Sequence, residues 1–162
     1  MVLVRETVPD DWRALRDIRL TALRDAPDAF ASTYAEQAAF GEAEWRDRVA
    51  RGGTFLAYVP EVSASDPAGL AGGYSREEPG VVELISMFVR PEARGRGVGE
   101  ALIVAVIDWA AARYATSVHL WVTETNSHAR LLYERSGFSP TGERQPLPSK
   151  PAIGEIGMTR RL

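Results

Sequence analysis

The residues of this sequence with the clearest potential for chemistry form a glycine-rich stretch between two apolar segments. The stretch comprises Arg94, Gly95, Arg96, Gly97, Val98, Gly99 and Glu100. Glycine tolerates left-handed backbone and lets a ligand approach the main chain closely. The start of a following helix offers unpaired amides and the positive end of its dipole, and two arginines add charge beside it. This pattern predicts a site for a phosphate or a pyrophosphate.

Three other interpretations compete for the same glycines. A dinucleotide-binding turn requires Gly-x-Gly-x-x-Gly or Ala, but its last place is Glu100 counting from Gly95 and Leu102 counting from Gly97. A nucleoside-triphosphate loop requires a lysine after its last glycine, and Lys150 is the only lysine of the chain. The third alternative, a glycine-rich turn that binds nothing, stays open at this point.

The stretch lies between segments whose patterns predict a mixed α/β domain spanning residues 1–162. Strands are expected at 2–7, 54–59, 70–75, 81–89, 118–122, at 138–141, where another strand begins, and at 155–160. Helices are expected from Pro9 to Pro27, within 34–49 in two pieces divided at Gly41, and at 99–114 and 126–136. Arg19 falls on the apolar stripe of the first helix, among residues that face inward. Residues 142–154 are rich in proline and are expected to form a loop.

Composition limits the classes of function. Of the 162 residues 45% are hydrophobic and 25% charged, and 19 basic against 22 acidic residues give a net charge of -3. That balance argues against nucleic acid as a partner, because phosphate contacts need a surplus of Lys and Arg. The absence of cysteine excludes disulfides, thiolate metal sites and a cysteine nucleophile. No apolar run reaches the ~20 residues of a membrane span, and Met1 to Glu6 does not resemble a signal peptide, so we expect a cytoplasmic protein without a membrane partner.

Two motifs give the sequence a family resemblance. Arg94-x-x-Gly97-x-Gly99 resembles the Arg/Gln-x-x-Gly-x-Gly/Ala signature of the GNAT superfamily of acyl-CoA-dependent acyltransferases, and the segment from Leu84 to Glu92 is similar to the strand that precedes it. The second motif stands at the family's place further along, with the pattern Asn126-x-x-Ala129-x-x-Leu132-Tyr133-Glu134-x-x-Gly137-Phe138. The resemblance implies the GNAT fold, with a mixed, mostly antiparallel, splayed sheet of about seven strands and about four helices. It also implies acetyl-CoA as cosubstrate, with no metal ion.

The resemblance implies a role for each cofactor-binding position. The backbone of Met87, Phe88 and Val89 would pair with the pantetheine arm like an added strand, and the amides from Gly95 to Glu100 would hold the pyrophosphate. Asn126 and Ala129 would contact the cofactor arm, although Asn126 could equally be a helix N-cap. The sequence leaves open whether the chain forms a homodimer.

The reaction needs a base and an acid. Reaching the free base of an amine of pKa near 10 costs roughly 4 kcal/mol over ~3 units at neutral pH. The resemblance implies Glu83 as base and Tyr133 as acid beside the sulfur; a solvated carboxylate and a packed aromatic ring are the alternatives. Period two places Glu83 on the face of Ile85 and Met87. His119 on the next strand could relay a proton or be structural. Without cysteine, we expect direct attack in a ternary complex.

The acceptor is not named by the sequence. Asp28, Tyr34 and Glu36 could bind a cationic amine, but polar surface positions are the preferred interpretation. Phe30, Phe40 and Trp45 have the spacing of core residues. We expect an N-acetyltransferase of a small-molecule amine. A protein or peptide N-terminal acetyltransferase and a non-catalytic acyl-CoA sensor are the alternatives.

Overall fold

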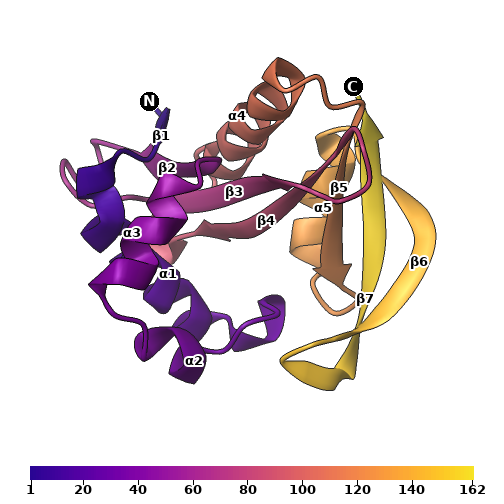
Figure 1. Cartoon of the computed structure of the whole chain (residues 1–162), viewed down its shortest axis with the longest axis horizontal. Coiled ribbons are helices and arrows are strands. Elements are labelled where there is room, and N and C mark those ends of the chain that lie inside the picture. The colour runs from indigo at the N-terminus through magenta and orange to yellow at the C-terminus, as the bar shows by residue number, and fades with distance from the viewer.

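A single seven-stranded sheet organises the computed structural model, which describes all 162 residues (Figure 1). The strands run in the order β1-β2-β3-β4-β5-β7-β6. They are β1 (Leu3–Glu6), β2 (Thr54–Tyr58), β3 (Gly69–Ser75), β4 (Val81–Val89), β5 (Ser117–Thr123), β6 (Ser139–Leu147) and β7 (Lys150–Arg161). Every neighbouring pair is antiparallel except β4 and β5. The predicted mixed, mostly antiparallel sheet is therefore confirmed.

The sheet opens at its centre. β4 and β5 are paired only from Val81–Ser117 to Glu83–His119, after which no register between them continues. Beyond that point β4 pairs only with β3, and β5 only with β7. Figure 1 shows the two strands diverging toward the lower half of the molecule. The inner edge of β4 from Leu84 onward thus keeps unpaired backbone groups.

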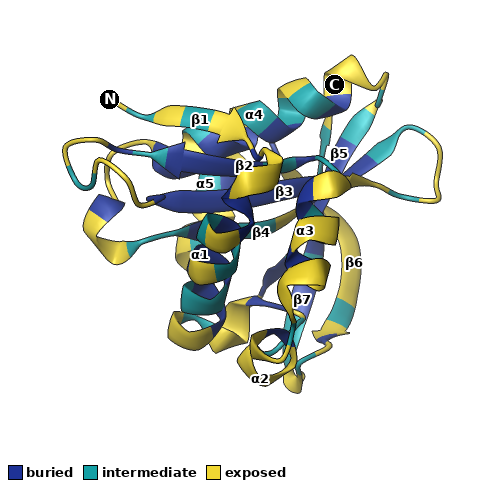
Figure 2. Cartoon of the chain, turned by 60° about the vertical axis from the view of Figure 1, so that its left-hand side comes forward, coloured by how far each residue is buried: buried dark blue, intermediate teal, exposed yellow.

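Helices cover both faces of the sheet. They are α1 (Trp12–Asp25), α2 (Tyr34–Ala38), α3 (Glu42–Ala50), α4 (Val98–Ala112) and α5 (Ser127–Arg135). One core cluster joins α4 to the sheet, and a second joins α1 and α3 to its other face. Figure 2 shows the buried central strands between these helices. The predicted break at Gly41 is confirmed, and no helix has the length and apolar character needed to cross a membrane.

An irregularity in β4 changes which side chains share a face. Ser86 has a φ of 62°, and the register with β3 shifts between Leu70 and Gly72. Leu84 packs in the α4 cluster, whereas Phe88 packs in the α1 cluster and Met87 lies against the α4 cluster. The prediction that Met87 shares a face with Glu83 is therefore wrong. The bulge inserts one residue into the period-two pattern, and a serine gives no sequence signal for it.

The C-terminal region forms a hairpin instead of the predicted proline-rich loop. β6 and β7 pair from Ser139–Thr159 to Leu147–Lys150, so residues 142–154 lie mostly in strands. Pro140 and Pro146 are tolerated because β6 is the edge strand of the sheet and needs donors on one side only. The prolines therefore indicated an edge strand of the sheet and not a loop without strand pairing.

Candidate functional site

The glycine loop forms a cluster of free backbone donors at the start of α4. Gly95 and Gly97 have φ angles of 75° and 81°, and a Cβ at either would meet nothing within 4 Å. None of the residues 95–100 donates its amide to another backbone group; after Arg94 the next donor is Ala101, to the Gly97 carbonyl. These amides lie at the positive end of a 15-residue helix. Such a loop can hold an anion without any side chain.

These amides border a cavity of about 520 Å³ between β4, the loop, α4 and α5. Its wall includes all the predicted cofactor-binding residues except Arg96 and Tyr133. They are Met87, Phe88, Val89, Arg94, Gly95, Gly97, Val98, Gly99, Glu100, Asn126 and Ala129. The structure therefore brings together residues that lie up to 42 positions apart in the sequence. Arg96, which is exposed, lies in the loop outside the wall of the cavity.

Gly99 and Asn126 each have a structural role at this cavity. A Cβ on Gly99 would lie 2.8 Å from Leu132 Cδ2, so glycine lets α4 and α5 pack closely. The Asn126 side-chain oxygen accepts a hydrogen bond from the Ala129 amide at 3.1 Å and caps α5. This interaction matches the N-cap interpretation, and Asn126 also lines the cavity.

Tyr133 is buried beside the cavity without lining it. Only 6% of the residue is exposed, and its ring packs edge-on against Phe138 with centroids 6.0 Å apart. Burial raises the pKa of the phenol well above its usual value, so the hydroxyl keeps its proton at neutral pH. The packing interpretation of this residue is thus realised, and its role as an acid stays a prediction.

Glu83 and His119 form a buried pair where β4 and β5 separate. The two residues are 3% and 5% exposed, and His119 Nδ1 lies 2.8 Å from Glu83 Oε2. On the other side of the ring, Nε2 lies 2.9 Å from Oε1 of the exposed Glu143 on β6. Arg76 approaches Glu83 at 3.5 Å. Carboxylate, imidazole and carboxylate thus connect the interior of the sheet to its surface.

The charge state of His119 follows from its two partners. Burial opposes protonation of the ring, but the hydrogen bonds and charges of Glu83 and Glu143 outweigh it, so the pKa of His119 lies above its usual value. The hydroxyl of Thr141 and the imidazole of His119 in turn lower the pKa of Glu143. Glu83 and His119 were candidates from the sequence, but Glu143 was not, because it falls in the segment predicted to be a loop.

Most of the chain matches a known protein family. The sequence profile described as "Acetyltransferase (GNAT) family" matches residues 12–138, which include the loop, the cavity wall and the Glu83–His119 pair. This chain is a member of the GNAT acetyltransferase family. The predicted resemblance is confirmed.

Individual relatives of this GNAT chain are similar over different extents. A mycothiol acetyltransferase of Clavibacter michiganensis subsp. michiganensis is 34% identical over 131 residues, 80% of this chain and 39% of the relative. An N-acetylaspartate synthetase of Danio rerio is 36% identical over 77 residues, 48% of this chain and 27% of the relative. This chain spans less than half the length of the curated relatives it matches. A GCN5-related N-acetyltransferase from Kribbella flavida has a similar structure, with a TM-score of 0.77, 27% identity and coverage of 99% and 98%.

In this GNAT chain the β6–β7 turn contacts the segment after α1. Ser149 Oγ donates to the Phe30 carbonyl at 2.5 Å, and Lys150 Nζ lies 3.2 Å from Asp28 Oδ1. Glu36 accepts a hydrogen bond from the amide of Thr33, the N-cap of α2. Asp28 and Glu36 are both exposed, as the polar surface interpretation predicted. Tyr34 is exposed. Trp45 is core, as expected, while buried Phe30 also lines the cavity.

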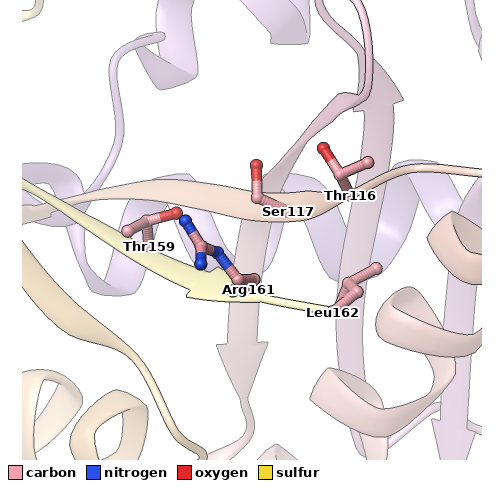
Figure 3. A pocket seen from close by; sticks show the side chains of 5 residues that line it. All are labelled: Thr116, Ser117, Thr159, Arg161 and Leu162. Carbon is pink, nitrogen blue, oxygen red and sulfur yellow. The ribbon is translucent and has the colours of Figure 1, made fainter.

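A separate hollow lies where β5 begins and β7 ends (Figure 3). It measures about 550 Å³ and is lined by Thr116, Ser117, Thr159, Arg161 and Leu162. Arg161 and Thr159 point from the same face of β7. No residue with a predicted role lines this hollow, and it shares no residue with the cavity beside the glycine loop.

Proposed function

We propose that the chain is an N-acetyltransferase that moves an acetyl group from acetyl-CoA to a small-molecule amine by direct attack in a ternary complex. The observation that carries the proposal is the row of free amides at 95–100 on the wall of a cavity that also contains the open edge of β4. Amides at a helix start suit the pyrophosphate of CoA. An unpaired strand edge suits the amide groups of a pantetheine arm.

Different residues of the chain would bind different parts of acetyl-CoA. The backbone of Met87 and Val89 offers hydrogen-bonding groups along β4, and Ala129 gives the arm a small neighbour on α5. Gly95 and Gly97 leave space beside their amides for phosphate oxygens. Arg94 supports the charge from the same wall. When bound, acetyl-CoA supplies the thioester that the amine attacks.

The protons follow two routes in this proposal. As the amine nitrogen bonds to the acetyl carbon, its proton must leave. The amine must reach the thioester beside Met87, on the wall of the cofactor cavity. Glu83 lies three residues before Ser86, the neighbour of Met87, which is about 10 Å at ~3.3 Å per residue, so Glu83 accepts the proton through water and not by direct contact. His119 and Glu143 can pass the proton on to the surface. The carbon–sulfur bond breaks, and the leaving thiolate takes its proton from the Tyr133 hydroxyl. Because burial raises the pKa of this phenol, the phenolate is only transient and takes a proton back from water in the cavity.

A small acceptor is supported by the contact between the β6–β7 turn and the segment after α1. The acceptor is proposed to enter between the β6–β7 turn and the segment after α1. Ser149 bonds to Phe30 there, and Lys150 bonds to Asp28. These contacts close the gap through which an extended peptide would have to pass. The relatives' names refer to two different products, mycothiol and N-acetylaspartate, so they do not select the acceptor.

The test combines binding with turnover. Calorimetry with acetyl-CoA should detect one site, and a thiol reagent should detect CoA released in the presence of amines. The chain has no cysteine, so the reagent reports only the product thiol. Initial rates should give intersecting patterns, as direct attack requires, and parallel patterns would contradict it. Binding without turnover on a broad amine panel would favour a sensor, and turnover restricted to peptide N-termini would favour the peptide enzyme.

A further inference from the structure

A third cavity lies on the face of the sheet that α1 and α3 cover. It measures about 150 Å³, larger than the ~30 Å³ that one water occupies in the liquid, and so large enough for a small polar group. Its wall contains three arginines and no acidic side chain. We call it the arginine pocket, with Arg19, Arg48, Arg51, Tyr74, Ile85 and Ser86 as its main residues.

Arg19 is the residue that makes this pocket unusual. It is only 5% exposed, and its Nη1 has no hydrogen-bond partner. Its Nε donates to Gln37 Oε1 at 3.0 Å, and the guanidinium lies 4.9 Å from the centre of the Phe30 ring. A buried guanidinium without a carboxylate partner is costly unless an anion completes its hydrogen bonds.

The neighbouring cations increase this need. Arg48 donates to the same Gln37 oxygen at 3.2 Å, so one neutral acceptor serves two guanidinium groups. None of the three arginines forms an ion pair, although arginines elsewhere on the chain pair with carboxylates. Burial and the charge of Arg48 lower the pKa of Arg19 to about 10, which still leaves it charged at neutral pH.

The pocket adjoins the proposed site of acetyl transfer. Tyr74 pairs with Glu83 across β3 and β4, and Gly72 pairs with Ile85, so Glu83 shares the sheet face that carries the pocket. Ser86 precedes Met87, whose backbone lines the cofactor cavity. Phe30 borders that cavity on one side and contacts Arg19 on the other. On the pocket wall, Ile85 is two strand residues from Glu83, about 7 Å, and Ser86 is one residue from Met87, about 3 Å.

We propose that the arginine pocket binds a carboxylate of the acceptor, so that the substrate is a small amine that carries a carboxylate, such as an amino acid. The planar fork of arginine matches the two oxygens of a carboxylate. The amine would then point along the sheet face toward Ser86 and the water that leads to Glu83. This inference rests on the proposed acetyltransferase function for its account of the amine, while the anion site rests on the arginines alone.

The activity test compares amino acids with their own carboxamides. The two acceptors have the same size, and the carboxamide holds its amine proton less tightly, so chemistry alone favours the carboxamide at neutral pH. We expect kcat/KM to be about tenfold or more higher for the acids. Arg48→Gln and Arg51→Gln should remove this preference. Arg46→Gln, on the same helix but paired with Glu42 on the surface, should keep it.

A binding test separates this inference from the proposed function. Without cofactor, N-acetylglycine and N-acetylglycinamide are titrated into the full chain and followed by chemical shifts. Only the acid should perturb the residues of the arginine pocket, and Arg48→Gln should abolish the effect even if Arg19→Gln does not fold. Equal behaviour of acid and amide, or preferential binding of inorganic phosphate there, would overturn the carboxylate assignment. Failure to bind acetyl-CoA would instead overturn the proposed function.

Discussion

Replacement of Gly97 by tryptophan should separate cofactor binding from backbone strain. Gly97 has a φ of 81° and Gly142 a φ of 91°, and a Cβ at either would meet nothing within 4 Å. A non-glycine residue in left-handed backbone costs roughly 1–2 kcal/mol. Gly97→Trp and Gly142→Trp should therefore lose similar amounts of unfolding free energy, which denaturant titration measures.

Only the first variant should lose the cofactor. Gly97 borders the cavity, whereas Gly142 lies in β6 away from it. Blocking two charge-assisted hydrogen bonds at ~1.5–3 kcal/mol each removes about 3–6 kcal/mol, or roughly a hundredfold to ten-thousandfold in Kd. Calorimetry with CoA is the assay. A Gly97→Trp protein that is folded and binds CoA within about threefold of the parent chain would refute the assignment of the loop.

Three further outcomes follow from single side chains. Tyr133→Phe should lower turnover by about a hundredfold with CoA affinity unchanged, because Tyr133 does not line the cofactor cavity; unchanged turnover would remove it from the mechanism. Glu143→Gln should lower the pKa of His119 in an NMR titration. Folding raises the pKa of His119. The stability that protonated His119 contributes is therefore fully present below about pH 6.5 and is lost as pH rises through the folded pKa. Relative to the parent chain, Glu143→Gln should therefore lose more free energy of unfolding in acid than in base. Met158→Ala should cost about 2–5 kcal/mol in denaturant titration, because the fully buried side chain leaves a cavity; a loss below about 1 kcal/mol would contradict this.

Local features of the sequence were sufficient for much of the candidate site. Positive φ at Gly95 and Gly97 depends on residue type, so the loop could be located before any fold was known. The boundaries of the strand at 81–89 and the cap at Asn126 also depend on short-range pattern. Arg19 gave a signal as well, since a charged residue on an apolar stripe predicts a buried charge that needs a partner.

Other parts of the site depend on how distant segments meet. Glu143 reaches His119 only because an edge strand rich in proline pairs with β7, and Arg48 shares Gln37 with Arg19 only because α3 packs beside α1. The bulge at Ser86 moves Phe88 to the face of the sheet that α1 covers, and no glycine at this position indicates the bulge in the sequence.

The sequence by itself determined the strand–loop–helix unit, the family and the residue types available for catalysis, since these follow from local conformation and short motifs. The tertiary structure alone decided where β4 and β5 part, which carboxylates reach His119, and that three arginines gather without an acid. Those features arise from strand register and helix packing, which depend on contacts between residues far apart in the chain and not on the character of any one segment.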